Sequence, residues 1–194
     1  MPAITDKSNK APLLKTGPMN HGTLACIDIV VTRRFYEEVL GLEVIQTSPR
    51  SLMVKKGGDY VYACVELPEG ATKDDMEMLN HNGFEVYSPE EVQEAYKTIK
   101  AIKDEWGIKK VTPPRVMHGD HTFYFMDMDG NWWEVVYTDA GRYVDDFSDA
   151  NSDLTGRHDL EHWVDVWNND RKLMHMHDPE VRGKAKSNQA DGKS

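Results

Sequence analysis

The sequence has little cysteine, no long apolar run and a deficit of positive charge, and each shortage excludes a class of protein. Its two cysteines, Cys26 and Cys64, provide no disulfide framework. We therefore expect two buried thiols in a cytoplasmic protein. No apolar run approaches the roughly 20 residues that span a bilayer, and residues 1–15 lack the apolar core of a secretory signal. We expect no association with a membrane.

Acidic residues outnumber basic ones along the chain. There are 23 Lys and Arg residues against 33 Asp and Glu residues, which gives a formal net charge of −10. A chain without a basic stripe is a poor match for a phosphate backbone, so we expect no nucleic-acid partner. Five Trp, eight Tyr and five Phe residues among 194 instead predict a folded globular protein.

The chain divides into four segments. Residues 1–20 predict a flexible arm and residues 181–194 a disordered tail, because both are polar and lack apolar periodicity. Residues 21–139 predict one folded domain, and residues 140–180 an acidic extension. Apolar residues at helical spacing in the extension predict an amphipathic helix that packs on its own domain, forms a dimer contact or acts as a lid. These residues are Leu160, Trp163, Val164 and Trp167.

The folded domain contains two units, residues 21–67 and 80–138, with the same predicted order of one strand, one helix and three strands. In the first unit the strands are predicted at 23–31, 43–47, 51–55 and 60–67, and the helix at 32–40. In the second unit the strands are predicted at 81–87, 109–117, 120–126 and 131–138, and the helix at 89–106.

The repeat predicts the fold class. The two units share their order of elements but little sequence identity, so the repeat is one of structure. We predict an α+β fold in which two βαβββ units pair their sheets into a cupped, incomplete barrel. The interior of such a cup is a natural place for a small ligand.

Three residues in equivalent places predict a metal site. His21 and His81 each begin the first strand of their unit, and Glu134 lies in the last strand of the second unit. Two imidazoles and one carboxylate, with other positions open, suit non-haem Fe(II) or a similar divalent ion. A histidine at a strand start is often only a surface residue, and the equivalence of His21 and His81 favours the metal hypothesis.

Three motifs over residues 20–139 resemble the vicinal oxygen chelate superfamily, which includes glyoxalase I, bleomycin- and fosfomycin-resistance proteins and type I extradiol dioxygenases. The first is HGTLACIDIVVTRRFYEEVLGLEV, with His21 at its start and Asp28 seven residues later. The second is HNGFEVYSPEEVQEAY, which begins with His81. The third is FYFMDMDGNWWEVVY, where Met128 replaces the usual proline and Glu134 stays in register.

This resemblance implies that a divalent metal, held by His21, His81 and Glu134, chelates two adjacent oxygens of a small substrate. The segment most resembles single-domain extradiol dioxygenases, which cleave a catechol with O₂ and have a tyrosine ten residues before the glutamate ligand. Tyr124 has that spacing here. His118 and His121 are the candidates for proton transfer. The resemblance implies Fe(II), with Mn(II), Zn or Ni as alternatives, and a homodimer.

Two other functions stay open at this point. Glu66 ends the last strand of the first unit, where glyoxalase I and the epimerases have a fourth ligand. A site with four ligands would favour a lyase or isomerase that moves protons. A non-catalytic resistance protein that sequesters a drug in an acidic cup is the third hypothesis, and it needs no metal.

Overall fold

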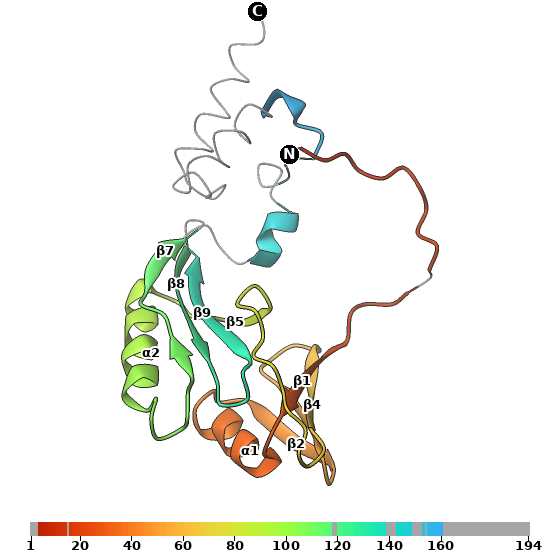
Figure 1. Ribbon diagram of the computed structural model, residues 1–194. Coiled ribbons are helices and arrows are strands. Elements are labelled where there is room, and N and C mark those ends of the chain that lie inside the picture. The colour runs from red at the N-terminus through yellow and green to blue at the C-terminus, as the bar shows by residue number, and fades with distance from the viewer. Residues whose placement is uncertain are drawn as a thin grey trace, which may run out of the picture.

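The computed structural model describes residues 4–14, 16–117, 120–138, 143–148, 153 and 155–160. It contains two mixed sheets, each with one helix of its own, in two successive units (Figure 1). The order of strands and helices confirms the predicted α+β architecture of two βαβββ units. Both sheets are open. No helix among the described residues is both long and apolar enough to cross a bilayer.

Unit one forms a four-stranded sheet in the order β1-β4-β3-β2. The first strand pairs in parallel with the last, and the remaining pairs are antiparallel. The elements are β1 (His21–Cys26), α1 (Ile29–Glu38), β2 (Glu43–Ser48), β3 (Ser51–Lys55) and β4 (Val61–Glu66).

The first predicted strand was too long, and its second half belongs to α1. Strand β1 ends at Cys26, and the β-branched run that begins at Ile29 forms the first helical turn. Asp28 decides this, because its Oδ1 accepts hydrogen bonds from the backbone N–H of Val30 and Val31 at 2.9 and 3.1 Å. A carboxylate at this position satisfies amides that have no partner in the first turn, and it outweighs the β-propensity of the run.

Unit two repeats this arrangement in a five-stranded sheet. The order is β5-β9-β8-β6, and β7 also pairs with β8. Pro113 and Pro114 split the single strand predicted at 109–117, because proline cannot donate to the ladder. The elements are β5 (His81–Glu85), α2 (Pro89–Ala101), β6 (Lys110–Val111), β7 (Arg115–Met117), β8 (Asp120–Met126) and β9 (Trp132–Thr138).

One hydrophobic core joins the two units. Helix α1 contributes Phe35 and Tyr36, and β9 contributes Trp133, all essentially inaccessible to solvent. The rings of Tyr36 and Trp133 meet edge to face with centroids 5.8 Å apart. The two units therefore share buried apolar surface as well as a chain connection.

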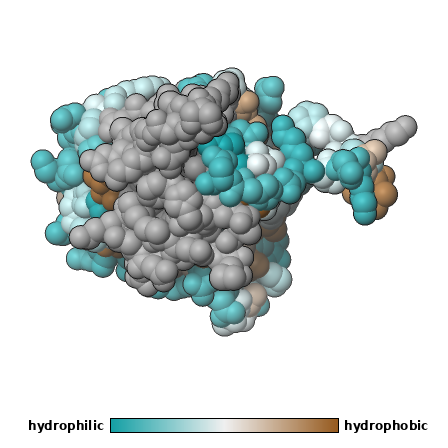
Figure 2. Space-filling model, turned by 90° about the horizontal axis from the view of Figure 1, so that it is seen from above, coloured by the Kyte–Doolittle hydropathy of each residue, from teal (hydrophilic) through white to brown (hydrophobic). Residues whose placement is uncertain are grey.

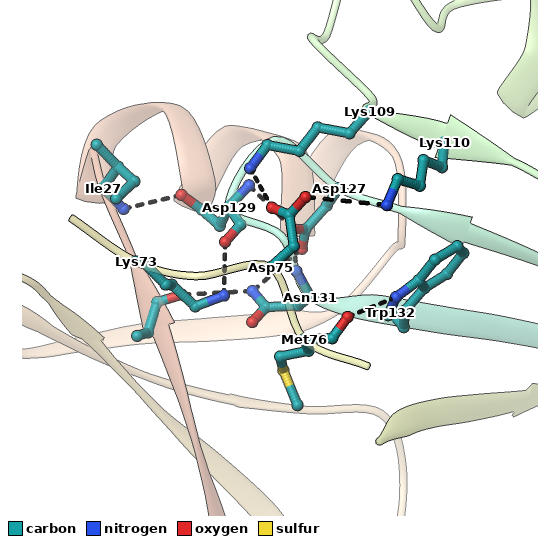
Figure 3. Close-up of polar contacts among 11 residues, drawn as sticks. Ile27, Lys73, Asp75, Met76, Lys109, Lys110, Asp127, Asp129, Asn131 and Trp132 are labelled. Carbon is teal, nitrogen blue, oxygen red and sulfur yellow. Dashed lines mark hydrogen bonds and ion pairs between the residues drawn. The ribbon is translucent and has the colours of Figure 1, made fainter. Parts of the chain in front are cut away.

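The turn between β8 and β9 fixes unit two against the start of α1. Asp127, buried inside this turn, accepts hydrogen bonds from the backbone N–H of Asp129 and Asn131 and from the indole N–H of Trp133, each at 2.9 Å. Asp129 in turn accepts from the backbone N–H of Ile27 at 2.8 Å and from the hydroxyl of Thr32 at 2.7 Å. Figure 3 shows the contact between Ile27 and Asp129 at this junction.

The segment before β5 closes over the same turn. Lys73 Nζ donates to the backbone oxygen of Asp129 at 2.6 Å, and the indole N–H of Trp132 donates to the backbone oxygen of Met76 at 2.9 Å (Figure 3). The methionines Met76 and Met78 pack against the buried cluster of Tyr124, Met126 and Trp132. The linker between the units is therefore part of the folded body.

The N-terminal arm loops away from the domain and returns to the C-terminal extension (Figure 1). The backbone N–H of Gly156 donates to the backbone oxygen of Thr5 at 2.8 Å, and His158 Nε2 lies 3.0 Å from Asp6 Oδ1. The arm carries exposed apolar side chains, Leu13 and Leu14, and Figure 2 shows it projecting at one side. The described residues of the arm form no helix or strand, and the predicted flexibility of the arm stays a prediction.

Two short 3₁₀ helices, η1 (Tyr143–Phe147) and η2 (His158–Leu160), are the regular elements described in the extension. The predicted amphipathic helix and the predicted tail fall largely on residues 161–194, outside the described residues.

Candidate metal centre

His81 and Glu134 are neighbours on two paired strands of unit two. Strands β5 and β9 run in parallel with Gly83 opposite Glu134, so His81 lies two residues before the partner of the glutamate. His81 Nε2 is 3.1 Å from Glu134 Oε2, and the glutamate side chain is 7% exposed. A Cβ at Gly83 would lie 3.8 Å from the same Oε2, at ordinary van der Waals distance, so the carboxylate does not require glycine at this position.

The second nitrogen of His81 determines what the first can do. His81 Nδ1 lies 2.7 Å from the backbone oxygen of Met78. A carbonyl oxygen only accepts, so Nδ1 carries the hydrogen of the neutral ring. Nε2 then directs a lone pair at the carboxylate of Glu134, and this contact is favourable only when a cation binds both atoms. The donor set therefore fits either a proton on Nε2 or a divalent metal ion.

Thr122 and Tyr124 complete the surroundings of Glu134. The hydroxyl of Thr122 donates to Glu134 Oε1 at 2.6 Å and holds the carboxylate in place. Tyr124 is directly opposite Glu134 in the β8–β9 pair, and its ring meets that of His81 edge to face with centroids 5.0 Å apart. Burial, together with the Glu134 carboxylate, raises the pKa of Tyr124, so its hydroxyl stays protonated at neutral pH.

His21 lies apart from this pair. It begins β1 on the exposed face of unit one, with Nδ1 2.7 Å from the side-chain oxygen of Asn20. Among the residues that the structure describes, no three His, Cys, Asp or Glu side chains gather closely enough to hold a metal ion. The single chain thus brings His81 and Glu134 together and leaves His21 elsewhere.

Glu66 is engaged in contacts of its own. Its Oε1 accepts from the backbone N–H of Ile29 at 3.0 Å, and its Oε2 lies 3.6 Å from Arg50 Nε. Glu66 pairs with Cys26, five residues along the strand from His21, a separation of roughly 16 Å. The register places Ala63, opposite Thr23, at the position in unit one that corresponds to Glu134.

The two histidines proposed for proton transfer are not part of the described cluster. Side chains alternate between the faces of a strand, so His121 lies on the opposite face of β8 from Tyr124. There its ring is 6.0 Å from that of Tyr137. His118 lies outside the described residues.

Sequence analysis missed Thr122 and the carbonyl of Met78. The position of Thr122 was predictable, because it precedes Tyr124 by two residues in a strand and must share its face. The Met78 carbonyl carried no signal, because any residue type provides the same backbone oxygen.

The comparisons with known proteins agree on the fold. The sequence model of the Glyoxalase/Bleomycin resistance protein/Dioxygenase superfamily matches residues 19–135. The chain is similar to the solved structure of FosX, a genomically encoded fosfomycin resistance protein from Listeria monocytogenes, with 23% identity and a TM-score of 0.51 over 67% of this chain and 98% of that one. The same protein has been solved with Mn(II) and sulfate, and that structure matches with 22% identity and a TM-score of 0.50 over 73% and 97% of the two chains.

A third similar structure is a glyoxalase/bleomycin resistance protein/dioxygenase from Nocardioides. It has 19% identity and a TM-score of 0.50, over 67% of this chain and 89% of that one. No curated protein matches the sequence. The family match spans more than half of the chain and includes both His21 and Glu134. The chain belongs to the Glyoxalase/Bleomycin resistance protein/Dioxygenase superfamily.

Proposed function

We propose that the protein is a metal-dependent enzyme that binds its substrate through two adjacent oxygens. The observation that carries the proposal is the pair of His81 Nε2 and Glu134 Oε2, 3.1 Å apart, with Nδ1 of the histidine held by a carbonyl. Tyr124 beside this pair supplies a protonated hydroxyl. A divalent ion on these ligands would act as a Lewis acid and would align the substrate oxygens.

We further propose that His21 of a second copy completes the ligand set in a homodimer. Two observations support this. His21 lies on a face of unit one that is exposed and partly apolar, with Ile45 64% and Val65 41% exposed. The corresponding face of unit two is buried at Tyr124 and Glu134. An apolar sheet face in solvent is a candidate for association, and a two-fold axis would bring each His21 to the other copy's His81 and Glu134.

Extradiol cleavage of a catechol with O₂ is the reaction we propose, with Fe(II) as the metal ahead of Mn(II), Zn or Ni. Tyr124 is the residue that supports it. Its ring lies against that of His81, and we propose that its protonated hydroxyl donates a hydrogen bond to an oxygen of the bound catechol. The buried surroundings of Tyr124 exclude water, which strengthens that hydrogen bond.

The direct test is anaerobic loading with Fe(II), followed by a panel of catechols in the presence of O₂. We expect oxygen uptake and a yellow ring-opened product. If none of the catechols gives oxygen uptake, despite full metal loading, ring cleavage is rejected. The remaining candidates are then a lyase, an isomerase or a drug-binding protein. Tight binding of a cationic drug by metal-free protein would support the last of these.

A Tyr124→Phe variant should bind metal normally and turn over poorly. The substitution keeps the ring and removes one hydrogen bond to a charged oxygen, which is worth roughly 1.5–3 kcal/mol. If the bond is fully formed in the transition state, kcat falls about 10- to 100-fold. Metal content by elemental analysis and oxygen uptake provide the two measurements. An unchanged kcat would remove Tyr124 from the reaction.

A Glu66→Gln variant should keep its metal and most of its activity. Glutamine retains the oxygen that accepts from Ile29 and loses only the ion pair with Arg50, which is partly exposed. Such a pair contributes less than about 1 kcal/mol. Elemental analysis, oxygen uptake and thermal unfolding of the variant test this. Loss of the metal would instead favour the lyase or isomerase with Glu66 as a fourth ligand.

A further inference from the structure

Two cations lie on the aromatic rings that flank Glu134. We call the side of the unit-two sheet that carries Tyr124 and Glu134 the site face. Arg115 pairs with Thr122, and Lys110 pairs with Met126, in antiparallel register. Residues directly opposite each other share a face, so both cations belong to the site face. The guanidinium carbon of Arg115 lies 5.9 Å from the centre of the Tyr124 ring.

The two cations differ in their partners. Lys110 Nζ, also 5.9 Å from the centre of the Trp132 ring, lies 4.0 Å from Asp75 Oδ2 (Figure 3). Arg115 is exposed, and in the described part of the chain no salt bridge joins it to a carboxylate. Other arginines in this acidic chain, such as Arg34, do have a carboxylate partner. An arginine that has no carboxylate partner among the described residues, beside a candidate ligand site, can take the carboxylate from a ligand.

The geometry points to a substrate that carries a carboxylate, which Arg115 binds while the two adjacent oxygens occupy the metal site. This inference rests on the proposed function and names its substrate class. Tyr124 lies between the two binding elements, because its ring contacts both His81 and Arg115. A single aromatic ring with adjacent hydroxyls at one end and a carboxylate at the other would lie across Tyr124 and reach both.

Arginine suits this role better than lysine would. Its planar guanidinium donates two parallel hydrogen bonds to a carboxylate, so it fixes direction as well as charge. The hydroxyl of Thr112 accepts from the backbone N–H of Tyr124 at 2.8 Å and ties the segment before β7 to β8. Arg115 therefore projects from a backbone, that of β7, which is hydrogen-bonded to β8, the strand that carries Tyr124.

The test compares two probes in the full chain loaded with Zn(II), which does not react with O₂ in this setting. The probes are catechol and 3,4-dihydroxybenzoate, and the readout is the dissociation constant from calorimetry. We expect the wild-type protein to bind the carboxylated probe roughly tenfold more tightly than catechol, since the added bond joins two charged groups at an exposed position. Arg115→Gln should remove this preference.

Two further variants make the result specific. Arg34→Gln, on α1, removes an equal charge and another arginine stacked on an aromatic ring, 5.3 Å from the centre of Trp106. It should retain the preference for the carboxylated probe. Arg115→Lys should restore part of the preference, because it keeps the charge and loses the paired donors.

The outcomes separate this inference from the proposed function. If both probes bind to the wild-type protein with equal affinity, or if Arg115→Gln keeps the preference, the carboxylate site is rejected and the metal site stands. If neither probe binds to protein that holds Zn(II), the chelating function fails, and this inference fails with it.

Discussion

A Glu134→Ala variant is expected to fold and to lose its divalent metal. Glu134 provides the carboxylate beside His81 Nε2, and alanine leaves that nitrogen without its partner. Altering residues that only support a ligand costs 10- to 100-fold in metal affinity, so removal of a ligand should cost more than about 100-fold. His81→Ala and His21→Ala should behave in the same way. Elemental analysis of purified protein measures the loss, and circular dichroism checks the fold.

His121→Ala is the matched control for metal content, since this histidine lies on the opposite face of β8. It should retain the wild-type amount. Full metal occupancy in any one of the three ligand variants would remove that residue from the site.

The same variants test whether two copies share each site. Mixed and allowed to exchange subunits, His21→Ala and Glu134→Ala chains would form mixed dimers in which one of the two sites has all three ligands. Random pairing should then restore about a quarter of the metal sites. A site built within one chain would regain none, because each chain in the mixture lacks a ligand.

The second large effect is expected at Asp127. Its replacement by alanine should lower the free energy of unfolding by about 4 kcal/mol, because the buried donors of Asp129, Asn131 and Trp133 lose their acceptor together. Denaturant unfolding measures the change. Asp59→Ala, an exposed aspartate in a loop, is the control and should stay within about 0.5 kcal/mol of wild type. A loss below 1 kcal/mol at Asp127 would contradict the structural role of this turn.

The stability provided by Asp127 should also depend on pH. Burial raises the pKa of Asp127 from 3.8 to about 6; the indole N–H of Trp133 opposes this shift, and the nearby Asp129 adds to it. The folded state therefore holds the proton more tightly than the unfolded state. This contribution is complete below about pH 4 and is lost as the pH rises through 6, a change of about 3 kcal/mol. Asp127→Asn cannot ionise and should lack this part of the pH dependence.

Much of the fold could be predicted from the sequence, because local patterns of apolar and turn residues set the bounds of several strands. The strands predicted at 51–55 and 120–126 have the bounds observed, because Gly and Pro residues or turn residues isolate them on both sides. The strand predicted at 23–31 is wrong in its second half, because the side chain of Asp28 accepts hydrogen bonds from the first turn of α1 and starts a helix there. Helix α2 ends at Ala101, although its apolar spacing continues to Trp106, because apolar spacing does not require the chain to remain α-helical.

The candidate site was predictable only in part. The repeat placed His81 at the start of the first strand of unit two and Glu134 in its last strand, and the two residues are neighbours in the structure. Their role as metal ligands stays a prediction. The separation of His21 from them depends on how the two units pack, and strand order within a unit carries no information about that. The same holds for the position of Arg115 over Tyr124, since it depends on the pairing of β7 with β8.

His21 and His81 each lie on the first strand of their unit, and that strand pairs with the last strand of the same unit. Strand β1 pairs with β4, and β5 pairs with β9, so each pairing closes the longest loop in its unit. Antiparallel neighbours such as β8 and β9 form through short turns, and folding rates fall as contacts become less local. Strands β1 and β5 should therefore dock late, after the folding barrier has been crossed. Metal bound through them would then slow unfolding and leave the rate of folding almost unchanged.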